Sequence, residues 1–156
     1  MSPRAQQLHE TADRQIAELA AQLSAAGQPG LARPCAGRER LGDGTVGAVA
    51  AHTTDNYRRI GRFVSALGDA GEQHHSGQHG EEDRASDVEL DVLLVCLRSA
   101  RDAVATIGQL SNEQMDSVPP AGAMKFADGE RTLEQIIASL LKHQRHQVAA
   151  LAAALS

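Results

Sequence analysis

Aromatic residues are scarce in this chain of 156 residues, which has no tryptophan, one tyrosine and two phenylalanines. The hydrophobic core must therefore consist of Leu, Val, Ile and Ala, and Ala and Leu are also the best helix formers. A block of basic residues is missing as well, and the formal net charge is −5. Because nucleic-acid-binding proteins usually carry a stripe of Lys and Arg, we expect no nucleic-acid partner.

Long apolar runs do not occur in the sequence, and none approaches the roughly 20 residues that a helix needs to cross a bilayer. The N-terminus leads into a charged pattern instead of the apolar core of a signal peptide. We therefore expect a cytoplasmic protein without a membrane partner. Cys35 and Cys96 form no CxxC pair and are too few for a disulfide scaffold, so we expect two reduced thiols.

Four segments carry apolar residues at helical spacing, which predicts an all-α, antiparallel four-helix bundle that forms one domain over residues 1–156. Each helix, at roughly 22 to 25 residues, would span about 35 Å. In chain order, the predicted helices are Pro3–Ala26; Thr45–Gly68; one that opens at the capping-box pattern Ser86–Glu89 and fades near Leu110; and one from a second capping box at Thr132 almost to the C-terminus.

Two connections between these helices are long. Residues 68–85 are rich in glycine and acidic residues with almost no apolar anchor, which predicts a flexible, exposed loop. This loop could catch a metal ion adventitiously through three histidines, His74, His75 and His79. In the second connection, Ser111–Arg131, apolar side chains alternate over residues 124–127, which is compatible with a short extended segment.

Polar side chains at the rim of the predicted core are the candidates for chemistry. His52 lies roughly 95° from the centre of its helix's apolar stripe, on the same side as Asn56. Tyr57 lies nearer the stripe, so its ring should point into the bundle and its hydroxyl should need a partner. Asn56 and Tyr57 are thus candidates to line or support a site beside His52.

The last helix contributes a second pair of rim residues. His143 and Gln147 lie one turn apart, roughly 100° and 80° from the apolar stripe, whereas His146 should face solvent. An i,i+4 pair on one helix can hold a metal ion, although Gln is a poor ligand for Zn²⁺ or Ni²⁺. In the plainest interpretation, His52 and His143 are rim histidines that bond to neighbours such as Asp55, Asn56 or Gln147.

The order of these segments resembles the DinB-like superfamily, which includes thiol-dependent S-transferases and mycothiol-dependent maleylpyruvate isomerase. The helices could therefore follow the related order of that superfamily in place of a simple up-and-down order. The match covers nearly the whole chain and includes TVGAVAAH at Thr45–His52 and RTLEQ at Arg131–Gln135, before a His-containing last helix. In metal-binding members, one His of the second helix converges with an i,i+4 pair of the last. The resemblance implies a metal site of His52, His143 and Gln147, with Gln147 in place of the usual second His. If the second helix is aligned one turn later, the resemblance implies Tyr57 in place of His52.

Two functions follow as hypotheses. The resemblance implies a metal-assisted, thiol-dependent transferase or isomerase that acts on a small molecule, with Zn²⁺ or Ni²⁺ and a low-molecular-weight thiol as cofactors. The alternative is a non-catalytic protein that binds a small molecule in the bundle, as a resistance or accessory factor of secondary metabolism. A homodimer is left open by the sequence.

Overall fold

The computed structural model describes residues 2–68 and 88–156, and this part of the chain is helical. Its only β-type pairing is an isolated bridge between Pro34 and Thr45. The helices are α1 (Pro3–Gly30), α2 (Val46–Gly68), α3 (Leu90–Val104), the 3-10 helix η2 (Ala105–Gln109), the short α4 (Asn112–Asp116) and α5 (Leu133–Leu155). The prediction of an all-α chain is confirmed for the described residues.

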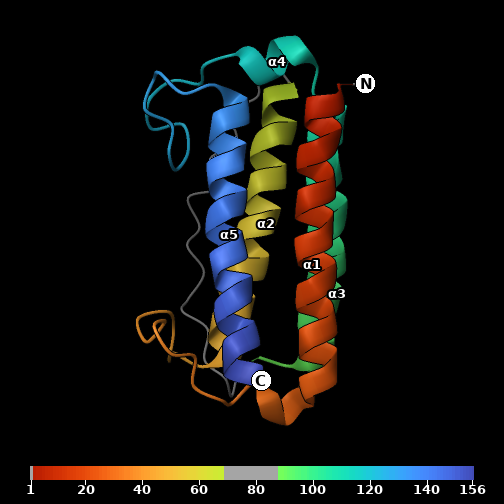
Figure 1. Ribbon diagram of the computed structural model, residues 1–156, viewed down its shortest axis with the longest axis vertical. Helices are drawn as coiled ribbons and strands as arrows, with labels where there is room; N and C mark the ends of the chain where they lie inside the picture. The colour runs from red at the N-terminus through yellow and green to blue at the C-terminus, as the bar shows by residue number, and fades with distance from the viewer. Residues whose placement is uncertain (1, 69–87) are drawn as a thin grey trace.

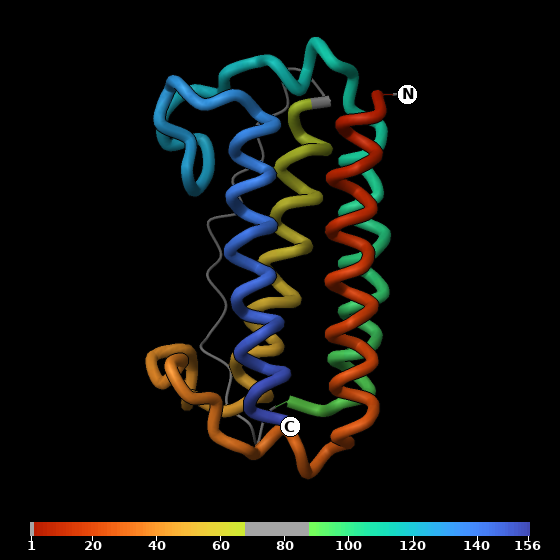
Figure 2. The backbone as a smooth tube through the Cα atoms, viewed as in Figure 1, coloured from red at the N-terminus to blue at the C-terminus, as the bar shows by residue number. Residues whose placement is uncertain are grey.

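The four long helices pack side by side as a bundle (Figure 1). Both α1 and α5 run away from the end of the bundle where the N-terminus lies, while α2 and α3 run toward it (Figures 1 and 2). Because α3 and α5 each pack between α1 and α2, the latter two are diagonal neighbours. Every long helix thus has one parallel and one antiparallel neighbour, so the expected fully antiparallel order is wrong.

The ends of the helices agree with the predicted stop and start signals in three cases. In α1, Gly27 has a φ of 69° and breaks the helical geometry, as its position after Ala26 predicted. The Thr45 hydroxyl accepts a hydrogen bond from the Ala48 N–H at 3.3 Å. The capping box of α5, between Thr132 and Gln135, is complete.

The third helix departs from its prediction at its start. It begins at Leu90, and the N-cap residue Glu89 makes no side-chain hydrogen bond. Residues 88 and 89, which the predicted capping box placed in the first turn of the helix, therefore precede it, and this part of the prediction is wrong. Ser86 itself and residues 69–85 of the predicted flexible loop lie outside the described residues. After Val104 the chain tightens into the 3-10 turn of η2, which ends at Gln109, so the predicted end near Leu110 is confirmed.

The connection between η2 and α5 contains structure that was not predicted. The short helix α4 is held by a capping box between Ser111 and Gln114. Residues 124–127 form a turn, so the extended piece that the alternation suggested is wrong. The Ala127 N–H donates to the Met124 carbonyl at 3.0 Å, and Phe126 has a φ of 73°. Local hydrogen bonds therefore outweigh the alternating pattern here.

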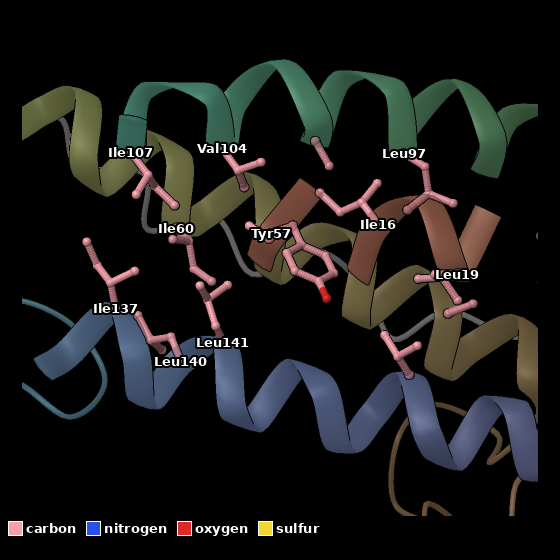
Figure 3. Packing of buried hydrophobic residues seen from close by; sticks show 14 of the residues in the cluster. Ile16, Leu19, Tyr57, Ile60, Leu97, Val104, Ile107, Ile137, Leu140 and Leu141 are labelled. Carbon is pink, nitrogen blue, oxygen red and sulfur yellow. The ribbon is translucent and has the colours of Figure 1, made fainter. Parts of the chain in front are cut away.

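Aliphatic side chains from all four long helices form the core, and Tyr57 is the aromatic residue at its centre (Figure 3). The backbones of α2 and α3 approach closely at Gly61: a Cβ atom added there would lie 2.5 Å from the carbonyl carbon and oxygen of Ala103. None of the described helices is apolar enough over a sufficient length to cross a membrane.

Candidate functional site

A chain of buried polar groups crosses the bundle at Tyr57. The Tyr57 hydroxyl donates to Oε1 of Gln15 on α1 at 2.7 Å, and Nε2 of Gln15 donates to the Leu141 carbonyl on α5 at 3.1 Å. Figure 3 shows the Tyr57 ring pointing into the bundle, as its place near the apolar stripe predicted. Burial raises the pKa of Tyr57 well above its ordinary value, so the phenol stays protonated.

Gln144 makes a second polar link between α2 and α5. Its Nε2 donates to the Thr53 carbonyl at 2.8 Å, and its Oε1 accepts from Nδ2 of Asn56 at 3.4 Å. Asn56 and Tyr57, both expected to line or support a site, therefore make hydrogen bonds within the protein. Because buried polar groups need partners, these bonds fix how α1, α2 and α5 meet and set the position of the rim beside them.

His52 on α2 and His143 on α5 belong to two helices that pack against each other, and the charge of His52 is close enough to lower the pKa of His143. Both side chains are partly buried. Desolvation lowers the pKa of His143, and the charges of Lys125, His52, Arg38 and His146 lower it further. The charges that act on His143 thus come from four basic groups, and the half-buried imidazole is held in its neutral form at neutral pH.

Arg38 completes this arrangement from the loop between α1 and α2. Its Nε donates to Oε1 of Gln147, and its Nη1 donates to the Gly37 carbonyl at 3.0 Å. Gln147 is buried, one turn after His143 on α5. Sequence analysis did not single out Arg38, because a loop arginine flanked by Gly37 and Glu39 has no local pattern that indicates a site.

The loop that carries Arg38 is fixed by its own backbone. The Cys35 N–H donates to the Gly44 carbonyl and the Val46 N–H donates to the Arg33 carbonyl, both at 2.8 Å. The buried Cys35 side chain faces the Ala150 carbonyl on α5 at 3.8 Å, and burial raises the pKa of its thiol. The loop is thereby anchored to α5, which sets the position of Arg38.

We call Arg38, His52 and His143 the rim cluster. The ligand set that the resemblance implies, His52, His143 and Gln147, fits a divalent metal ion poorly, because Oε1 of Gln147 already accepts a hydrogen bond from the Arg38 guanidinium, whose positive charge opposes a cation. Among the described residues, no three His, Cys, Asp or Glu side chains gather into a metal-binding group. The three basic side chains suit an anion better.

Comparison of the chain with known protein families, with curated proteins and with solved structures gave no match. The rim cluster is therefore the feature of the molecule that bears on its function.

Proposed function

We propose that this chain is a DinB-like small-molecule-binding protein that holds an anionic ligand at the rim cluster of Arg38, His52 and His143. The observation that carries the proposal is the anchored guanidinium of Arg38, which Gln147 and the Gly37 carbonyl hold beside α5. Preorganised in this way, the guanidinium loses little conformational entropy when a ligand binds.

The chemistry of the cluster favours a carboxylate, phosphate or sulfonate group. Two of the guanidinium nitrogens, Nε and Nη1, donate within the protein. A guanidinium has five N–H groups, so three remain that could donate to a planar or tetrahedral anion. Each imidazole adds a donor when it is protonated. A bound anion would offset the repulsion among the basic groups and raise the pKa of His143, so ligand binding and proton uptake should be coupled.

The rim is a better place for a ligand than the middle of the bundle. The Tyr57–Gln15 pair and the aliphatic side chains around it occupy the interior between the long helices. The metal-assisted, thiol-dependent transferase or isomerase implied by the resemblance stays a prediction. It needs a ligand set that Gln147, bonded to Arg38, does not supply.

Isothermal titration calorimetry with inorganic phosphate and with succinate, at about pH 6 and about pH 8 on either side of the ordinary His pKa, tests the proposal. Untagged protein is used, with His74, His75 and His79 replaced by Gln to remove adventitious binding. Arg38→Gln is the test variant. Arg40→Gln, an exposed arginine of the same loop, is the matched control.

We expect wild type to bind more tightly at the lower pH and Arg38→Gln to weaken binding by about 10- to 100-fold, as the loss of a charge-assisted hydrogen bond would. Arg40→Gln should stay within about twofold, as an exposed residue outside the site. Equal effects of the two substitutions, or no binding at millimolar ligand, would overturn the proposal. Titration with Zn²⁺ and Ni²⁺ completes the experiment, since tight metal binding lost in His143→Ala would instead support the metal hypothesis.

A further inference from the structure

A groove of about 400 Å³ lies between α1 and α3 at the surface of the bundle, and its lining residues Ala20 and Leu94 also pack against the core. Its lining is mostly apolar and consists of Ala20 from α1 and, from α3, Asp91, Leu94, Val95 and Arg98. Val95 is 54% exposed, and the adjacent Val92 is 56% exposed. Two valines in water on one short helix form an apolar surface that a partner would cover favourably.

Charged residues stand at both ends of this groove. Asp91 and Arg98 are separated by seven positions on α3, so they lie on the same face, about 10 Å apart along the helix axis. Among the described residues neither side chain makes an ion pair. Along this face of α3, an acidic residue is thus followed by an apolar one and then by a basic one, with Val95 near the midpoint between the two charges.

This order of charges is complementary to itself when the helix direction is reversed. If two copies of α3 meet in antiparallel orientation about a twofold axis close to Val95, Asp91 of each copy lies opposite Arg98 of the other. The valines then meet at the centre, and the small side chain of Ala20 at the border of the groove allows close approach. A twofold interface requires such self-complementarity.

We propose that this α1–α3 face is the homodimer interface of the protein, with two copies of α3 packed antiparallel about Val95. The proposal is independent of the rim cluster, which lies where α5 meets α2 and the Arg38 loop.

Sedimentation equilibrium of the full chain at micromolar concentrations tests this interface. Val95→Asp places two like charges near the twofold axis, and we expect it to give a monomer. Because Val95 is more than half exposed, the substitution should leave the monomer folded, which circular dichroism checks. Ala138→Asp, at an exposed site on α5, adds the same single negative charge; it is the matched control and should leave the dimer unchanged.

The charge order is tested by exchange. Asp91→Arg or Arg98→Asp alone should weaken dimerisation by about tenfold, because each places like charges opposite one another at both ends of the interface. The double exchange, Asp91→Arg with Arg98→Asp, should restore it to near the wild-type value. A monomeric wild type, a dimer unaffected by Val95→Asp, or a double exchange as weak as the single variants would each overturn the proposal.

Discussion

Gly61→Ala should destabilise the protein, although alanine is the better helix former. Gly61 lies within α2, and a Cβ atom there would come within 2.5 Å of the Ala103 carbonyl carbon and oxygen on α3. Helix propensity alone favours alanine by about 1 kcal/mol. Overpacking typically costs about 1–3 kcal/mol, and the upper end applies where the obstacle is backbone that cannot rotate away.

The net effect is a loss of about 2 kcal/mol in the free energy of unfolding, equivalent to roughly 4–8 °C in melting temperature for a domain of this size. Urea unfolding followed by far-UV circular dichroism measures it. The neighbouring carbonyl is also held in place, since the Thr106 hydroxyl donates to the Ala103 carbonyl at 2.8 Å. Adding Ala103→Gly should therefore not restore stability, because it removes only the Cβ atom at 2.6 Å and leaves the backbone contacts.

Ser65→Ala, one turn further along α2 at an exposed position, is the matched control. Without a packing conflict, it should raise stability by up to about 0.5 kcal/mol through helix propensity. If Gly61→Ala is as stable as wild type or more so, the close approach of α2 and α3 at this residue is refuted.

Three further predictions concern the core, the polar chain and the rim. Leu140→Ala should cost about 2–5 kcal/mol of unfolding free energy, and His146→Ala less than about 0.5 kcal/mol, since the first side chain is buried and the second exposed; equal losses in urea titrations would contradict the phase of α5. Tyr57→Phe should cost about 1–3 kcal/mol, because it leaves Oε1 of the buried Gln15 without its donor; a thermal melt unchanged from wild type would speak against the buried bond. The stability of wild type relative to His143→Gln should fall as the pH drops below about 6.5. The folded state lowers the pKa of His143, so as the pH falls the unfolded chain takes up the proton before the folded protein does, and protonation then favours unfolding. If the urea midpoints of wild type and His143→Gln differ by the same amount at every pH, this reasoning is refuted.

The sequence alone determined where the four long helices lie and which apolar side chains form their inward stripes, whereas the short α4 was not predicted. Periodicity placed Tyr57 and Leu140 in the core, and local capping chemistry fixed the start of α2 at Thr45 and of α5 at Thr132. These features depend on side chains within one or two helical turns of each other, so the local sequence is sufficient to predict them. The resemblance to the DinB-like superfamily and the metal ligands it implies stay predictions.

Tertiary structure decided the direction and the neighbours of the helices. Loop lengths do not specify whether a connection crosses a bundle diagonally, and the diagonal placement of α1 and α2 gives every long helix a parallel neighbour. The same packing brings Arg38, from a loop without a recognisable motif, onto Gln147 of α5. Those two residues are 109 positions apart, and an interaction over that separation depends on the folded path of the chain, which no local spacing encodes.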